Sequence, residues 1–177
     1  MFSRSSRGRL TDRDLGRFPD DTLFHRVARA VCHAGCLPRK ELYETWEMAR
    51  RVRRRFRGGR VIDLGGGHGL LAQVMLLLDD SSPNALVVDT ALPASSGRVH
   101  QVLTQAWPRL AGRITLSPAR WRTPRFSPPT SSSRAMRAGA SLIGCSSGPS
   151  PRGHGWPCCH VLTAGDAGQL AGWVDGP

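Results

Sequence analysis

The residues with the clearest chemistry follow a short apolar run: an acid, Asp63, and then glycines at every second position, Gly65, Gly67 and Gly69. Glycine lets a turn bring its backbone amides close to a ligand, and the start of a helix adds partial positive charge there. Twenty residues later a second apolar run ends in another acid, Asp89, whose carboxylate can accept hydrogen bonds from ribose hydroxyls. The spacing therefore predicts a site for a nucleoside-bearing cofactor.

Cysteine and histidine form two further groups. One is Cys32, His33 and Cys36, and the other is Cys158, Cys159 and His160. Their spacing matches none of the usual pairs of zinc-ligand motifs, and adjacent cysteines rarely bind one ion without strain, so we predict no metal site. The second group remains a weak candidate for catalysis, beside the alternatives of buried packing and a chance run. A nucleophilic thiol would need an activated thiolate, of which the sequence gives no sign.

Apolar periodicity places the glycine motif between a strand over 60–64 and a helix over 69–79, and the next strand runs over 85–89. Upstream it predicts an amphipathic helix over 22–34 and a second from Pro38 to the glycines at 58 and 59. Downstream it predicts a helix through Val99, Leu103 and Trp107, and a short strand over 113–116. This alternation is typical of the first half of a doubly wound α/β sheet. We interpret His68, inside the glycine turn, as a solvent-facing loop residue rather than a base.

Arginine dominates the charge. All but one of the 25 basic residues are arginine, the formal net charge is +12, and sixteen of these residues lie before position 61. The run over 50–57 makes the outer face of the second predicted helix strongly basic. Such a face attracts phosphate-rich partners, so RNA is kept as a partner, although an ordinary solvated helix face is the interpretation we favour.

The chain has no apolar stretch long enough to span a bilayer, and its N-terminus lacks the apolar region of a secretory signal. The five cysteines are interpreted as free thiols. We therefore expect a cytoplasmic protein with no membrane partner. A transit peptide is an alternative that the N-terminal composition leaves open.

The segment over 117–155 differs in character from what precedes it. It is rich in Pro, Ser, Arg and Gly, it lacks apolar periodicity, and no Asp, Glu or Lys occurs between Thr90 and Gly165. A structureless segment of this length is unusual inside a compact α/β domain. It is either a disordered insertion or a damaged sequence.

The pattern Asp63-x-Gly65-x-Gly67-x-Gly69 resembles motif I of the class I S-adenosylmethionine-dependent methyltransferases, whose alternating glycines it fits better than the GxGxxG of NAD-binding proteins. The segment 156–160, Trp-Pro-Cys-Cys-His, resembles a Pro-Cys-Cys-His or Pro-Cys-Cys-Tyr segment in a subgroup that includes RNA-modifying members. The resemblance covers roughly 38–116 and 156–177. It implies S-adenosyl-L-methionine as cofactor and an unknown methyl acceptor. The implied cofactor-binding residues are Asp63, Gly65, Gly66, Gly67, Gly69 and Asp89.

In that subgroup a His-Ala-Cys-Gly segment followed by Thr-Asp normally comes after the fourth strand, whereas this chain has an unrelated stretch over 133–144. Read in the frame that borrows the third base of each codon, codons allowed for 135–139 can spell His-Ala-Cys-Gly. Those for 141–143 can spell Thr-Asp. We therefore hypothesise one frameshift near Ser117 and a restoring one shortly before Trp156, so that strands four and five lack their native sequence.

These observations predict five segments: a flexible basic arm over 1–21, N-terminal helices over 22–59, the cofactor-binding half of a methyltransferase domain over 60–116, an irregular and frameshifted segment over 117–155, and a truncated C-terminal part over 156–177. The expected fold is α/β, an incomplete Rossmann-like class I methyltransferase sheet with N-terminal helices. The expected function is methyl transfer, in an impaired form. A basic nucleic-acid-binding protein and a non-functional methyltransferase remnant are the open alternatives.

Overall fold

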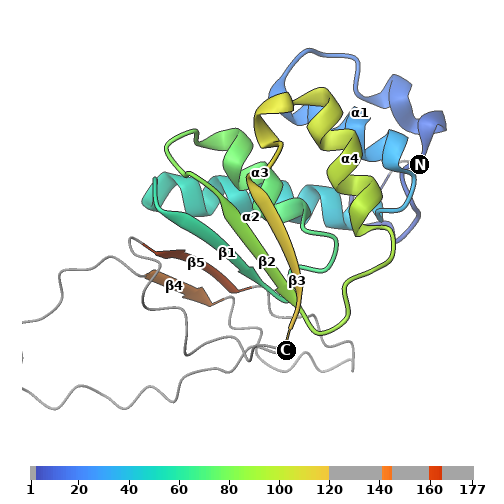
Figure 1. The fold of residues 1–177 in the computed structure, drawn as a ribbon. Helices are drawn as coiled ribbons and strands as arrows, with labels where there is room; N and C mark the ends of the chain where they lie inside the picture. Colours follow the sequence, from blue (N-terminus) through green and yellow to red (C-terminus); the bar gives the residue numbers. More distant parts are fainter. Residues whose placement is uncertain (1–2, 120–140, 145–159, 165–177) are drawn as a thin grey trace, which may run out of the picture.

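The computed structural model describes residues 3–119, 141–144 and 160–164. The elements follow one another along the chain as two 3₁₀ turns, four α-helices and five strands within these residues (Figure 1). They are η1 (Asp12–Arg17), α1 (Leu23–Ala34), α2 (Arg39–Arg55), β1 (Arg60–Leu64), α3 (Leu70–Leu78), β2 (Ala85–Asp89), α4 (Ser96–Ala106), η2 (Pro108–Leu110), β3 (Ile114–Pro118), β4 (Ser141–Gly144) and β5 (His160–Ala164).

Three strands form a parallel sheet in the order β3-β2-β1. Val61 lies opposite Ala85, and Ala85 lies opposite Ile114, so the carboxyl ends of all three strands meet at one edge. Parallel strands need a crossover between them, and α3 and α4 supply the two crossovers. The predicted strands over 60–64 and 85–89 are confirmed, and the third begins one residue later and ends two residues later than expected.

On the other side of β1 the sheet is antiparallel. β5 pairs with β1 in the antiparallel sense, and β4 pairs with β5 in the same way. A complete doubly wound sheet would have a parallel strand beside β1. The fold is therefore mixed α/β, and the described residues contain only the parallel half of the expected sheet. β4 also lies inside the segment over 117–155 that was predicted to be irregular, because residues 141–144 find a pairing partner in β5.

The helices gather on one side of the parallel strands (Figure 1): α3 packs on β1 and β2, α2 packs on α3, and α1 packs on α4. α1 begins where the Thr22 hydroxyl accepts a hydrogen bond from the His25 amide (3.3 Å), and it ends at Gly35 in the left-handed conformation. α2 follows Pro38, as predicted, and ends at Arg55, three residues before the first glycine of the pair at 58 and 59. The two predicted helices thus agree with α1 and α2 within a few residues at each end.

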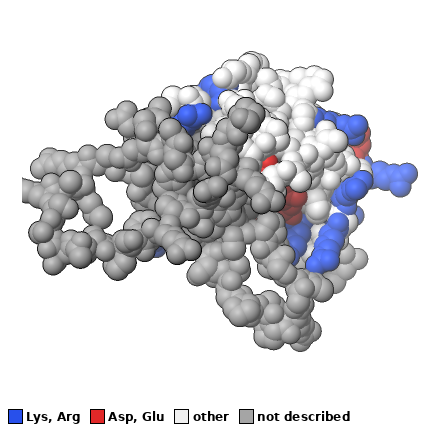
Figure 2. Space-filling model, turned by 60° about the horizontal axis from the view of Figure 1, so that its bottom comes forward, with Lys and Arg blue, Asp and Glu red and all other residues white. Residues whose placement is uncertain are grey.

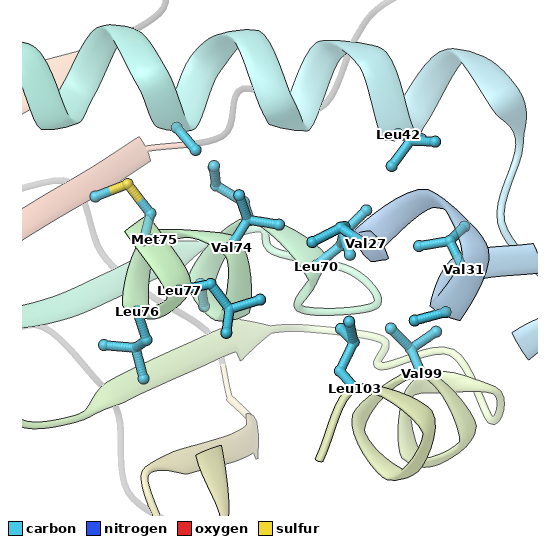
Figure 3. Packing of buried hydrophobic residues seen from close by; sticks show 14 of the residues in the cluster. Val27, Val31, Leu42, Leu70, Val74, Met75, Leu76, Leu77, Val99 and Leu103 are labelled. Carbon is cyan, nitrogen blue, oxygen red and sulfur yellow. The ribbon is translucent and has the colours of Figure 1, made fainter. Parts of the chain in front are cut away.

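The apolar core lies between the helices and the sheet (Figure 3). Every residue from Leu70 to Leu77 is buried, because α3 is enclosed by β1, β2, α2 and α4. Val27 and Val31 of α1 approach Val99 and Leu103 of α4 in the same cluster. This packing fixes the start of α3, and hence the glycine loop that precedes it.

The N-terminal segment differs from the flexible arm expected over 1–21. Leu10 and Phe18 are fully buried in the core, and the Leu10 amide donates a hydrogen bond to the Leu37 carbonyl (2.9 Å). η1 lies between these two anchors and packs against α1. Two apolar side chains in a polar stretch give no periodic signal, but they suffice to attach residues 10–18 to the core.

The arginine run over 50–57 also differs from a uniformly exposed basic face. Arg53 is 4% exposed, and its guanidinium lies 3.1 Å from the Asp79 carboxylate. It also donates hydrogen bonds to the Met75 carbonyl (3.1 Å) and the Ser82 hydroxyl (2.8 Å). Burial alone would raise the pKa of Asp79, but hydrogen bonds from Ser81 and Gly58 and the Arg53 charge outweigh it and lower that pKa. Arg53 is therefore a structural residue that ties α2 to the end of α3.

Candidate cofactor site

The glycine loop connects the carboxyl end of β1 to the start of α3. Gly65, Gly67 and Gly69 have positive φ angles of 71°, 49° and 72°, a conformation that costs other residues roughly 1–2 kcal/mol. The Gly65 amide donates a hydrogen bond to the Val88 carbonyl (2.7 Å), and the Gly69 amide donates one to the Gly66 carbonyl (2.7 Å). The alternating glycines are thus explained by three left-handed positions in one tight turn.

The glycines of the loop differ in how much space surrounds the position of an added Cβ. A Cβ on Gly66 would lie 2.7 Å from the Asp63 carboxyl group and from a Val87 methyl, so only glycine fits there. A Cβ on Gly69 would come within 3.1 Å of Val87. A Cβ on Gly67 would meet nothing within 4 Å. Gly66 and Gly69 therefore allow close packing of the loop, while Gly67 borders open space.

Asp63 is fully buried beneath this loop, at 0% exposure. Neither of its carboxylate oxygens accepts a hydrogen bond among the described residues. Burial, with the smaller effect of the Asp89 and Glu41 charges, raises its pKa to about 7, although the nearby Ala72 amide favours the ionised form. Burying an unpaired carboxylate lowers the stability of the folded chain. No contact within the described fold offsets this cost, so the fold alone does not explain why an acid stands at position 63.

Asp89 lies at the carboxyl end of the neighbouring strand and faces the same loop. One of its oxygens accepts a hydrogen bond from the Gly67 amide (2.9 Å), and the other accepts one from the Ala91 amide (3.0 Å). Asp89 is thus a cap for the turn. Each carboxylate oxygen can still accept a further bond, so capping and ribose binding are compatible. The structure brings Asp63, Asp89 and the glycine loop together, as the spacing predicted.

These residues fit a cationic, nucleoside-bearing cofactor. Asp63 is an orphaned buried carboxylate, which matches an ammonium or sulfonium charge nearby. Asp89 offers acceptors of the kind that ribose hydroxyls need, and Gly67 leaves its side of the loop clear of side-chain atoms. Asp63 and Asp89 would repel a pyrophosphate, so at these residues only the loop amides could bind one. Among the described residues, the fit therefore favours a nucleoside with a positive charge over a dinucleotide.

His68 corrects the sequence interpretation. Its side chain is only 17% exposed, and it contacts residues from two other parts of the fold instead of facing solvent. Nε2 lies 3.0 Å from the Ser95 hydroxyl, and Nδ1 lies 3.4 Å from the Glu41 carboxylate. The periodicity gave no sign of this, because Glu41 and Ser95 reach the loop only through the packing of α2 and α4. The only feature of the sequence that could have drawn attention to Glu41 and Ser95 is that each lies at the start of a helix.

Of the two cysteine and histidine groups, the structure describes Cys32, His33 and Cys36. Burial raises the pKa of the Cys32 thiol to about 12, which disfavours the thiolate that a nucleophile needs. His33 pairs with Asp12 at the surface (2.7 Å). Cys158 and Cys159 lie outside the described residues, and His160 is known here only as the first residue of β5, opposite Leu64 in register. Within the described ranges, no group of three His, Cys, Asp or Glu residues is placed to hold a metal ion.

Comparisons with known proteins give this chain no relative. No protein-family model, no curated protein and no solved structure matches it. Across the described part of the chain, no helix has the length and apolar character required to cross a membrane. The geometry of the site is therefore the basis for assigning a function.

Proposed function

We propose that this chain is an S-adenosyl-L-methionine-dependent methyltransferase of the class I, Rossmann-like type. One observation carries the proposal: the unpaired buried carboxylate of Asp63 lies under a glycine loop whose Gly67 amide is bonded to Asp89. This arrangement occurs at the carboxyl ends of adjacent parallel strands, where α/β sheets bind ligands. It supports both the expected cofactor and the residues predicted to bind it.

The chain's own residues would act by binding and orientation. Asp63, Asp89 and Glu41 concentrate negative charge around the glycine loop, which favours a cation over an uncharged analogue. Gly67 leaves room for the ligand, and Asp89 supplies the ribose acceptors. When bound, S-adenosyl-L-methionine supplies a methyl group activated by its sulfonium. The contribution of the protein is then alignment of that methyl group with an acceptor.

Calorimetric titration with S-adenosylhomocysteine and S-adenosylmethionine tests the proposal. We expect saturable binding to the wild-type chain and its loss in Gly67→Arg, whose side chain would fill the open side of the loop. Gly112→Arg is the matched control, because Gly112 is also left-handed (φ 70°) with nothing within 4 Å of an added Cβ, but lies in the turn before β3. Equal binding to both variants would refute the site.

Arginines on α2 support a second candidate, binding of nucleic acid. Arg50, Arg54 and Arg55 are exposed, and basic side chains dominate the charged part of the described surface in Figure 2. Arg51, in contrast, pairs with Glu47 (3.0 Å). Binding of RNA or DNA that weakens linearly with the logarithm of salt concentration would support this candidate. A third interpretation, a remnant without activity, predicts a folded chain that binds neither cofactor nor nucleic acid.

A further inference from the structure

A pocket of about 650 Å³ opens beside the glycine loop, between the N-terminal ends of α2 and α4. Its lining includes Arg9, Glu41, His68, Ser95 and Arg98. Asp63, Gly67 and Asp89 do not line this pocket. The pocket therefore lies next to the proposed cofactor site, and the two share only the glycine loop, which carries His68. Its volume lies within the range of pockets that bind small molecules.

The imidazole of His68 is held by one group at each nitrogen. Glu41 lies 3.4 Å from Nδ1, and because a carboxylate can only accept, this contact favours the proton on Nδ1. Nε2 then has a free lone pair, to which the Ser95 hydroxyl can donate over 3.0 Å. The arrangement shows that a hydroxyl fits at hydrogen-bond distance from a nitrogen able to accept its proton.

Two guanidinium groups border the same pocket. Arg9 and Arg98 are exposed, and within the described residues neither has an ion-pair partner. The acid that lines the pocket, Glu41, contacts His68 and neither of these arginines. Unpaired guanidinium groups beside a concave surface are suited to a carboxylate or a phosphate, which they bind through paired hydrogen bonds.

We propose that this pocket holds the methyl acceptor, a small molecule that carries a carboxylate or phosphate and a hydroxyl. Arg9 and Arg98 bind the anion, and His68 is the catalytic residue that takes the hydroxyl proton at Nε2, with Glu41 as a positioning residue. This rests on the proposed methyltransferase function. An oxygen lone pair forms the new bond to the methyl carbon, the carbon–sulfur bond breaks with its electron pair on sulfur, and the proton moves to His68 and then to solvent.

Anion binding tests the role of the arginines without the reaction. Inorganic phosphate and 4-hydroxybenzoate are titrated separately into the cofactor-free chain and followed by amide shifts of the pocket residues. The probe that binds more tightly identifies the anion class. We expect Arg9→Ala/Arg98→Ala to weaken binding of that probe at least tenfold, and Arg54→Ala, an exposed arginine of α2, to change it less than twofold. Equal effects of both variants would overturn the proposal.

The tautomer of His68 tests the role of Glu41. Nitrogen-15 shifts of the imidazole should show the proton on Nδ1 in the wild-type chain, and a mixture of tautomers in Glu41→Gln, whose amide can also donate. His100, which contacts Gln73 rather than an acid, is the internal control. A proton on Nε2 in the wild-type chain would overturn the assignment of His68 as a base, whatever the effect of the variant on stability.

Saturation with S-adenosylhomocysteine separates this proposal from the proposed function. If the cofactor product binds and leaves anion affinity within twofold, both stand. If it binds and displaces the anion, the pocket belongs to the cofactor and the acceptor site is refuted. If the product does not bind at all, the methyltransferase function fails, and the acceptor proposal, which rests on it, fails with it even where the anion is bound.

Discussion

Replacing Asp63 by Asn should stabilise the cofactor-free protein at alkaline pH while weakening cofactor binding. Asp63 is fully buried with no hydrogen-bond partner among the described residues. Asn has nearly the same shape but cannot carry the buried charge, so the substitution removes the charge with little change in packing. The steric contact with Gly66 and Val87 is kept.

The magnitude follows from the raised pKa. The carboxyl group titrates at about 7 in the folded chain against a reference value of 3.8. The folded chain therefore holds a proton that the unfolded chain releases, and stability falls as pH rises from about 4 through 7. Three pKa units correspond to about 4 kcal/mol in full. Between pH 5 and pH 8 the wild-type chain should lose about 2–3 kcal/mol relative to Asp63→Asn.

Urea unfolding at pH 5 and pH 8 measures this difference, with tryptophan fluorescence as the signal, because Trp107 is buried and Trp46 packs against the core. Asp21→Asn, a substitution at an exposed acid (89% exposed), corrects for the loss of one charge from the whole chain. If the free-energy difference between the wild-type chain and Asp63→Asn is the same at both pH values, Asp63 is not a buried, unpaired acid, and the basis of the cofactor site fails.

Four further outcomes are expected. Gly66→Ala should lower the thermal stability of the fold, because its Cβ would lie 2.7 Å from Asp63 and Val87. Gly67→Ala should lower it only as much as Gly112→Ala does, because an added Cβ meets nothing within 4 Å at either position. A larger loss for Gly67→Ala would contradict the open space beside Gly67. Arg53→Ala should cost about 3–5 kcal/mol of unfolding free energy, because it leaves Asp79 buried without its partner; a cost equal to that of the exposed Arg54→Ala would contradict this. The stability that Asp79 contributes should be lost as pH falls below about 4, since its pKa is lowered in the folded chain; acid titration of Asp79→Asn against the wild-type chain checks it. The coding nucleotide sequence should spell His-Ala-Cys-Gly in the third-base frame over 135–139, and its absence would end the frameshift hypothesis.

Local signals predicted the parallel half of the fold well. Strands over 60–64 and 85–89 are short apolar runs with an acid at or next to their carboxyl ends, and Pro38 marks a helix start by backbone chemistry that is visible in sequence. These features depend on neighbouring residues alone. The geometry of the glycine loop was predictable for the same reason, since its glycines, its acid and the next strand all lie within 30 residues.

Features that depend on distant contacts could not be predicted. Arg53 and Asp79 are 26 residues apart and look like ordinary surface charges until α2 packs on α3. Glu41, His68 and Ser95 come together only through the packing of three separate elements. The antiparallel pairing of β5 with β1 likewise depends on a long-range choice of partner. Sequence periodicity shows which side of a helix or strand is apolar, but it does not show which other element packs against that side.

The most direct test of the central claim is calorimetry of S-adenosylmethionine binding at pH 7 in two buffers with different heats of ionisation. A cationic ligand beside the buried acid should lower the pKa of Asp63 and release a proton. The account predicts saturable binding with net proton release in the wild-type chain, and binding without that release in Asp63→Asn. Absence of saturable binding to the wild-type chain, or the same proton count in both chains, would contradict it.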